Sequence, residues 1–489
     1  MALINPTQLL KDPVFRHFHE ICQIPHGSGN EEGLALYIVR WAKEHGFHAD
    51  RDKVGNVFIR KPPAGSNTED IPAVMLQAHM DMVCVADEGV DFNPLTDPIK
   101  LLNDGEYLTA EGTSLGADDG IGISIIIFIL KNFVENPALK HGAIRVIFTV
   151  DEESGMSGAA ALDKSFLNDA SFLINCDSEN CEELVIGSAG SVHIDFHRRI
   201  LQSKPSNANA FRLSIGGLRG GHSGEEINSG RANAITLLGE LLSMIDENGG
   251  RVEISAIKGG KAVNAIADQS TVDIVTTFDA EHLQPIVEHF LDGVKKKFRA
   301  ADPDIAIKSA PIELPNFVLE NSCEIIALLK ELKQGVFAMQ TAELVETSAN
   351  LGIVSIDDSK LTVRYFPRSS RNEKLSAIVD DCNSIAERLH FDIETSEPST
   401  AWTENRNSPL ARLTAEVFAR QNSRPMLVKT IHAGLECSYF FDKNPALDII
   451  SIGTTNEHIH SPRERLKLST VAVQVNLIAE VLARLTENV

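Results

Sequence analysis

Cysteine is scarce in this sequence and shows no arrangement that would hold a small disulfide-rich fold together. Seven cysteines are spread over 489 residues, at positions 22, 84, 176, 181, 323, 382 and 437, and no two form a CxxC pair. Disulfide frameworks are typical of short secreted chains with closely spaced cysteines. We therefore expect free thiols and a reducing compartment.

Long apolar runs and an export signal are also missing. The most apolar stretch, residues 121–130, is followed by Lys131 and Asn132. It is well short of the roughly 18–20 residues that span a bilayer. The first residues, MALINPTQLLKDPVF, do not combine a basic leader, an apolar segment and a small-residue cleavage site. We expect no membrane segment, no export and a cytoplasmic location.

Positive charge is in deficit. Lysine and arginine number 45 against 68 aspartates and glutamates, which gives a formal net charge of -23. Such a chain opposes a polyphosphate backbone, so we expect no nucleic acid partner. Acidity of this size is typical of soluble cytoplasmic proteins, and the alternative is that some carboxylates gather around cations.

The residues that are present indicate a soluble globular protein with two or more structural units. The chain has 43% hydrophobic and 23% charged residues, and its length exceeds the about 100–200 residues of an ordinary domain. Helix and strand patterns alternate up to about Ser178, which is typical of an α/β sheet with helices on its faces. Strands are expected at residues 55–60, 74–85, 143–150 and 171–176.

The pattern changes near residues 187–205 into an α+β module. Strands at 211–215, 251–257, 271–277 and 361–365 accompany helices at 231–244, 281–298 and 374–389. From about Trp402 the earlier alternation returns, with a strand at 448–452 and a closing helix at 470–485. We therefore expect a middle domain, 188–398, inserted into a domain made of residues 1–187 and 399–489.

The first candidate for chemistry is the segment QAHMD at the end of an apolar strand. His79 and Asp81 lie two residues apart, so on a strand both side chains point to one face. An imidazole can ligate a metal while a nearby carboxylate fixes its tautomer and orientation. The alternative is that this short pattern arose by chance.

Further acidic residues follow other expected strands and turns. Asp118 and Asp119 lie in a Gly-flanked turn before an apolar helix, where a helix N-cap would explain only one of them. Crowded acids after buried strands repel one another unless cations or shared protons relieve them, with acidic N-caps as the alternative. These acids are Asp151, Glu152 and Glu153 after one strand, and Asp177 and Glu179 after the next.

A late histidine completes a ligand set for two cations that share a carboxylate. The segment NEHIHSPRE places His458 and His460 in a loop after an expected strand. Mixed oxygen and imidazole ligands suit zinc, manganese or cobalt better than calcium, which prefers oxygen alone.

Six motifs carry a family resemblance. QAHMDMV, GADDGIG, FTVDEESG, NCDSE, GGHSG and HSPRERL, in that order, resemble the co-catalytic dizinc metallopeptidases that include aminoacylases, glutamate carboxypeptidases and carnosinases. Within this family, IPHGSGNEEGL, HAGLEC and the SIGTT…HSPRER ending look like the bacterial cytosolic aminoacyl-histidine dipeptidase branch. The resemblance extends from Ile24 to the last helix and implies a catalytic domain with a mixed sheet and an inserted α+β domain that serves as lid and dimerisation domain.

The resemblance implies a role for each metal-site residue. His79, Asp118 and Asp177 would hold one cation, and Asp118, Glu153 and His460 the other. Asp81 would orient His79, and Glu152 would be the general base for a water that bridges the two ions. His460 is favoured over His458 because the family pattern places a glutamate four residues after the histidine, as Glu464 is here.

The resemblance also implies substrate-side residues in the inserted domain. His222 of GGHSG would stabilise the oxyanion at the partner subunit's active site in a homodimer. Asn264 and Arg368 would hold the backbone and carboxylate of the substrate, with Arg364 as the alternative to Arg368. Gly434 of HAGLEC is a further candidate. The family usually has glycine after HAGLEC, whereas Ser438 stands here.

These observations predict a metal-dependent dipeptidase that hydrolyses unblocked dipeptides, Xaa-His types included, with two divalent ions that are most simply zinc. An N-acyl amino acid amidohydrolase would use the same metals with a different pocket. A catalytically silent peptide-binding protein is the alternative outside enzymes. The intact Glu152 argues against the silent protein, because a binding protein has no use for the base.

Overall fold

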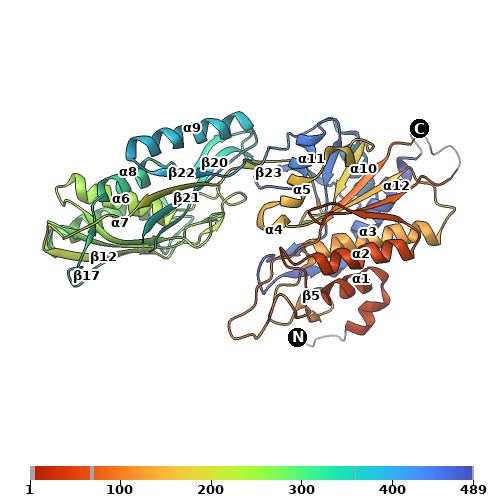
Figure 1. Cartoon of the computed structure of the whole chain (residues 1–489), viewed down its shortest axis with the longest axis horizontal. Coiled ribbons are helices and arrows are strands. Elements are labelled where there is room, and N and C mark those ends of the chain that lie inside the picture. Colours follow the sequence, from red (N-terminus) through yellow and green to blue (C-terminus); the bar gives the residue numbers. More distant parts are fainter. Residues whose placement is uncertain (1–5, 66–70, 358, 487–489) are drawn as a thin grey trace. The chain divides into compact units, whose positions relative to one another are not determined.

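The computed structural model describes residues 6–65, 71–357 and 359–486, so the first five residues of the segment considered for export lie outside it. The chain forms two compact units (Figure 1). Unit 1 comprises Met1–Gly187, Trp402–Thr430 and Leu435–Val489, and unit 2 comprises Ser188–Ala401 and Ile431–Gly434. Each unit has its own hydrophobic core, as expected for separate domains.

Unit 1 is built on an eight-stranded mixed sheet. Its strand order is β1 (His48–Arg51), β2 (Val57–Lys61), β6 (Ile144–Thr149), β3 (Val74–His79), β7 (Phe172–Asn175), β24 (Asp448–Ser451), β8 (Glu183–Ser188) and β23 (Leu427–Ile431). Strands β6, β3, β7 and β24 are parallel neighbours. Their carboxyl ends therefore meet at one edge of the sheet, where ligands of open α/β sheets are commonly held.

Helices of unit 1 pack against this sheet and against one another. The longest, α3 (Ala117–Glu135), is apolar on nearly all sides and is buried, because a helix without a polar face must lie inside the protein. It contacts β3 and two further helices, α1 (Pro13–Cys22) and α12 (Leu468–Arg484). The other helices are α2 (Glu32–Glu44), α4 (Glu152–Gly155), α5 (Ser157–Ala161), α10 (Pro409–Asn422) and α11 (Cys437–Lys443), with short 3-10 helices at Pro6–Lys11 and Lys164–Phe166.

A small antiparallel sheet of unit 1 supports the His460 loop. Its strand order is β25 (Asn456–Glu457), β26 (Arg465–Lys467), β5 (Tyr107–Ala110) and β4 (Leu101–Asn103). The loop between β25 and β26 is closed at its base by the ion pair of Glu457 and Arg465.

Unit 2 is an antiparallel α+β module. Its main sheet has the order β17 (Ala306–Pro311), β12 (Asn209–Gly216), β16 (Ser270–Thr276), β14 (Glu253–Gly259), β20 (Val345–Ile356), β21 (Lys360–Ser369), β10 (Ile194–Arg199) and β22 (Asp392–Thr395), with β19 (Gly335–Met339) and β9 (Gly190–Ser191) at its side. Its helices are α6 (Ala234–Glu247), α7 (Ala280–Lys297), α8 (Ser322–Glu331) and α9 (Asn372–Leu389). Two short pairs, β13 (Gly221–His222) with β15 (Ala265–Ile266) and β11 (Gln202–Ser203) with β18 (Val318–Leu319), lie outside the main sheet.

The predicted fold class, α/β with a mixed sheet plus an α+β module, is confirmed by this architecture. One expected strand is wrong in length, since residues 74–85 continue as strand only to His79. Beyond it, Met82 leaves the sheet and its N–H donates to the carbonyl of His26, 3.2 Å away. The short segment Ile431–Gly434 belongs to unit 2, whereas the sequence pattern predicts it within the second part of the catalytic domain, residues 399–489.

The cysteines and the helices bear on two expectations from the sequence, free thiols and no membrane segment. All seven cysteines are free. Among the residues that the structure describes, no helix is both long and apolar enough to cross a membrane.

Candidate active site

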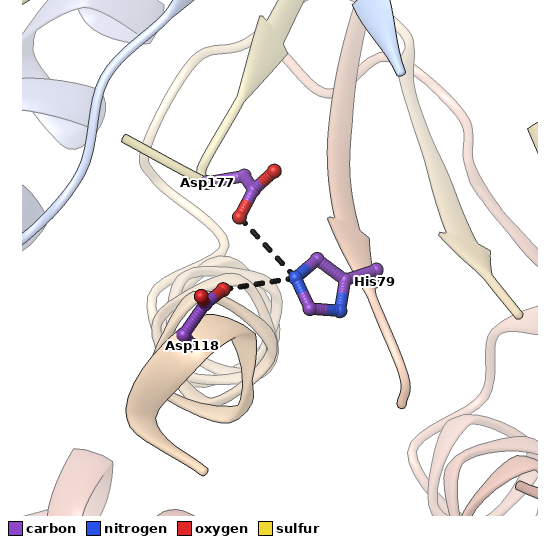
Figure 2. Close-up of side chains that lie close together, drawn as sticks. All are labelled: His79, Asp118 and Asp177. Atoms are coloured by element: carbon purple, nitrogen blue, oxygen red, sulfur yellow. Dashed lines mark hydrogen bonds and ion pairs between the residues drawn. The ribbon is translucent and has the colours of Figure 1, made fainter. Parts of the chain in front are cut away.

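Three side chains meet at the carboxyl edge of the unit 1 sheet (Figure 2). His79 is the last residue of β3, Asp118 lies at the start of α3, and Asp177 follows β7. The Nε2 atom of His79 is 3.0 Å from Oδ1 of Asp118 and 3.2 Å from Oδ1 of Asp177. These atoms lie close enough together for one metal ion to bind all three.

A second group shares Asp118. The Nε2 atom of His460 is 2.8 Å from Oε2 of Glu153 and 3.3 Å from Oδ2 of Asp118. Asp118 thus directs one carboxylate oxygen to each histidine, which is the geometry required of a bridging ligand. His458 and His460 are both exposed, but it is His460 that the structure brings to the acidic cluster.

Glu152 lies beside both groups. Together with His79 and Glu153 it forms a third set of atoms close enough to hold an ion. It begins the short helix α4, directly after Asp151, whose φ of 58° is in the left-handed region that non-glycine residues seldom adopt. His460 has a similar φ of 56°. Backbone of this kind is common at functional sites, where the surrounding structure holds it.

Asp81 links His79 to the acidic segment after β6. One of its oxygens, Oδ1, is 3.5 Å from Nδ1 of His79 and accepts a hydrogen bond from the N–H of Glu152 at 2.9 Å. The other, Oδ2, accepts from the N–H of Glu153 at 3.0 Å and from the hydroxyl of Ser28 at 2.7 Å. The Nδ1 atom of His79 also lies 3.0 Å from the backbone carbonyl oxygen of Asp81. The buried carboxylate therefore contacts both His79, as the sequence predicted, and the backbone at the start of α4.

Glu464 holds the turn that presents Asp118. Its carboxylate accepts hydrogen bonds from the N–H groups of Leu115, Gly116 and Ala117 at 2.8, 3.0 and 2.8 Å. Gly116 has no side chain to cap α3, so Glu464 supplies the acceptor that the first amides of a helix need. In the sequence, Glu464 serves only to distinguish His460 from His458, and nothing in its spacing indicates this contact.

The charges of the cluster are poorly balanced. Burial raises the pKa of Glu153 to about 7 and that of Asp177 to about 6. Burial also opposes the charged form of Asp118, but hydrogen bonds from His460 and His79 outweigh it and lower its pKa. The same pairing, with Glu153 and Asp118, raises the pKa of His460 to about 11 against the effect of burial.

The donor set fits divalent cations. Five acidic side chains converge with two imidazoles, and positive charge at this point would relieve their repulsion. Two buried oxygens, Oε1 of Glu153 and Oδ2 of Asp119, have no hydrogen-bond partner among the described residues. The five acids are Asp118, Asp119, Glu152, Glu153 and Asp177.

The predicted substrate-side residues all lie in unit 2. His222 on β13 pairs with Ala265 on β15, and the N–H of Ser223 donates to the carbonyl of Asn264 at 2.9 Å, so the structure brings His222 and Asn264 together. In the GGHSG loop, a Cβ on Gly224 would lie only 2.4 Å from the carbonyl oxygen of His432. The loop therefore packs against the segment that contains Gly434.

Arg368 and Arg364 have different surroundings. Arg364 is half exposed, and its Nε is 3.3 Å from Oδ2 of Asp195. Arg368 is only 5% exposed, its Nε has no hydrogen-bond partner among the described residues, and its guanidinium lies over the ring of Phe366. Burial lowers the pKa of Arg368 to about 10, so it remains charged at neutral pH. A buried guanidinium of this kind is suited to pairing with a carboxylate.

Comparison with known proteins assigns the family. The model of peptidase family M20/M25/M40 matches residues 75–484. The chain belongs to this peptidase family. The resemblance inferred from the six motifs is thereby confirmed.

Two relatives are similar over nearly the whole chain. The cytosol non-specific dipeptidase of Escherichia coli (strain K12) is 34% identical over an alignment of 491 positions, which covers 97% of this chain and 98% of that protein. The crystal structure of aminoacylhistidine dipeptidase from Vibrio alginolyticus matches with a TM-score of 0.81 and 33% identity over 97% of this chain and 96% of that chain. Human carnosine dipeptidase 1 shares the fold, with a TM-score of 0.57 and 12% identity over 98% of each chain.

Proposed function

We propose that this peptidase is a metal-dependent dipeptidase that hydrolyses unblocked dipeptides, Xaa-His dipeptides included. The observation that carries the proposal is the pair of ligand groups that share Asp118, with Glu152 beside them. The names of the relatives from Escherichia coli and Vibrio alginolyticus support dipeptides as the substrate class.

Two cations would be held by His79, Asp118 and Asp177 and by Asp118, Glu153 and His460. We infer zinc, with cobalt and manganese as alternatives, from the mixture of carboxylate and imidazole donors. When bound, such ions polarise a carbonyl group and make a neighbouring water more acidic.

Glu152 acts as the general base in this proposal. Its carboxylate accepts a proton from the water that attacks the peptide carbonyl, and it returns that proton to the amine nitrogen as the bond breaks. The hydrogen bond from the N–H of Glu152 to Asp81 supports this role, because it fixes the start of α4 relative to His79.

His222 is proposed to stabilise the oxyanion. Its Nδ1 accepts a hydrogen bond from the N–H of Glu225 at 3.2 Å. A backbone N–H can only donate, so the hydrogen of the neutral imidazole lies on Nε2, which makes this atom a donor. A donor is the group that a developing negative oxygen requires.

Arg368 is proposed to pair with the substrate's terminal carboxylate, with Asn264 and Gly434 contacting its backbone. Recognition of both the free N-terminus and the C-terminal carboxylate of the substrate would limit the enzyme to dipeptides. From the family resemblance we further propose a cytoplasmic homodimer in which His222 of one subunit acts at the metal centre of the other. Neither nucleic acid nor a membrane is a proposed partner.

A substrate panel tests this function. Metal-free protein would be reloaded with zinc, cobalt or manganese and assayed on Xaa-His and other dipeptides, on tripeptides, on C-terminally amidated dipeptides and on N-acetyl amino acids. We expect hydrolysis of unblocked dipeptides that chelation abolishes and metal restores. Preference for N-acetyl amino acids would favour the amidohydrolase, and hydrolysis of none of these with intact metal binding would favour the binding protein.

A further inference from the structure

Glu436 is a buried acid that belongs to neither proposed ligand group but contacts two of the strands that lead to them. Glu436, which precedes α11, is fully buried. Its Oε2 atom accepts two hydrogen bonds, from Nε2 of Gln77 at 2.6 Å and from the hydroxyl of Thr149 at 2.7 Å. Burial raises the pKa of Glu436 to about 8, and its other oxygen, Oε1, has no hydrogen-bond partner among the described residues.

The contacts continue across the sheet in one direction. Gln77 and Asn175 are register partners on the parallel strands β3 and β7. Nδ2 of Asn175 donates to Oε1 of Gln77 at 2.5 Å, and the N–H of Asp177 donates to Oδ1 of Asn175 at 3.3 Å. In this series of hydrogen bonds every donor points toward Glu436, which is the final acceptor.

The N–H of Asp177, at the other end, determines how both amides are turned. A backbone N–H can only donate, so Asn175 presents its oxygen to Asp177 and its NH2 group to Gln77. Gln77 then accepts with its oxygen and presents its own NH2 group to Oε2 of Glu436. Because Oε1 of Glu436 has no partner among the described residues, Oε2 remains the last acceptor whether or not Glu436 carries a proton.

The two strands that carry Gln77 and Asn175 end at proposed ligands of the same cation. Gln77 lies two residues before His79, and Asn175 lies two residues before Asp177. Thr149, the third member, is the register partner of His79 on β6. The chain of hydrogen bonds therefore joins the carboxyl ends of the strands that present His79 and Asp177, whereas His460 comes from a loop of the small sheet.

We infer that Glu436 is a positioning residue that fixes the spacing of His79 and Asp177 through Gln77 and Asn175, and so sets the affinity of the His79–Asp118–Asp177 cation selectively. This inference rests on the proposed metal sites. Groups that orient ligands from outside the coordination shell commonly change metal affinity about 10–100-fold.

Four variants of the full chain test it. Glu436→Leu removes the final acceptor. Glu436→Gln keeps one acceptor oxygen in a side chain of the same size. Thr149→Val removes one donor to Glu436. Thr414→Val is the matched control, because Thr414 is also fully buried in unit 1 and its hydroxyl has no hydrogen-bond partner among the described residues.

The readouts are the two cobalt dissociation constants, obtained by equilibrium competition with a chelator, and the Tm of the metal-free protein. The step that Asp177→Ala abolishes identifies the His79–Asp118–Asp177 site. Glu436→Leu should weaken this step about 10–100-fold more than the other step. Thr149→Val should do the same to a smaller extent, Glu436→Gln should recover most of the affinity, and Thr414→Val should change neither step.

Equal weakening of both steps, or no weakening in Thr149→Val and Glu436→Leu, would overturn the inference in favour of a purely structural role. If Glu436→Leu does not fold, Thr149→Val against Thr414→Val decides the matter. Wild-type protein that binds fewer than two ions would contradict the proposed function itself, and this inference with it.

Discussion

The carboxylate of Asp81 accepts a hydrogen bond from the N–H of Glu152, with Oδ1 and N 2.9 Å apart. The same oxygen lies 3.5 Å from Nδ1 of His79. Burial opposes the charge on Asp81, but its contacts, first among them the hydrogen bond with His79, lower its pKa to about 2. At neutral pH one charged group therefore contacts both a candidate metal ligand and the backbone of the candidate base.

Asp81→Asn should disturb both. An amide retains one oxygen but brings an NH2 group against an N–H of Glu152 or Glu153, which loses its acceptor. We expect metal affinity about 10–100-fold weaker, measured by competition with a chelator. Asp163→Asn, an exposed helix cap in the same unit, serves as control. Wild-type affinity in Asp81→Asn would show that this carboxylate does not orient the site.

Asp118 should matter for both ions. It is the carboxylate shared by the two proposed ligand groups, whereas Asp177 belongs to only one. Asp118→Ala should therefore lose both metals and reduce activity to background, while Asp177→Ala should retain close to one ion per chain. Elemental analysis after dialysis measures this, and two ions per chain in Asp118→Ala would refute the bridging role.

Strand ends and their acids were predictable from the sequence because they depend on local pattern. Asp177, and likewise Glu152 and Glu153, directly follow apolar strands. When such strands are parallel neighbours, their carboxyl ends meet at one sheet edge and bring these carboxylates together. The expected strand 74–85 was too long because Met82 pairs with Gly27, in a loop far away in the sequence. The apolar composition of residues 74–85 does not indicate this partner.

Contacts between residues far apart in sequence could not be predicted. Glu464 caps α3 from 347 positions away along the chain, measured to Ala117. Glu436 reaches Gln77 across 359 positions. Nothing in the spacing around either glutamate indicates its partner, since an isolated acid in a sequence is most simply a solvated surface residue.

The metal-free protein should lose stability as pH rises. Glu153 and Asp177 have pKa values raised from 4.5 to about 7 and from 3.8 to about 6, with burial the main cause. The folded state then binds more protons than the unfolded state between roughly pH 4 and 7, so the free energy of unfolding falls across this range. His460, whose pKa is raised from 6.5 to about 11, continues the decline at higher pH.

Thermal unfolding from pH 5 to 8 checks this expectation. The Tm of metal-free protein should fall with pH, less steeply in Glu153→Gln, and bound metal should remove the decline between pH 5 and 7. A Tm of metal-free protein that rises over this interval would contradict the assigned direction.

Complementation between two inactive chains tests the proposed role of His222. Asp118→Ala lacks metals but keeps His222, and His222→Ala keeps metals. If His222 acts across a homodimer, mixed dimers contain one intact site, and random reassociation should restore roughly a quarter of wild-type activity. The absence of any recovery in mixtures shown to contain the mixed dimer would place His222 outside the partner's reaction.

The most direct test of the central claim is turnover and metal content measured together on Glu152→Gln. The substitution preserves size and removes proton acceptance, so we expect two bound ions per chain and turnover reduced by about two to four orders of magnitude. Turnover within a few-fold of wild type, with both ions bound, would contradict Glu152 as the base in a dinuclear dipeptidase.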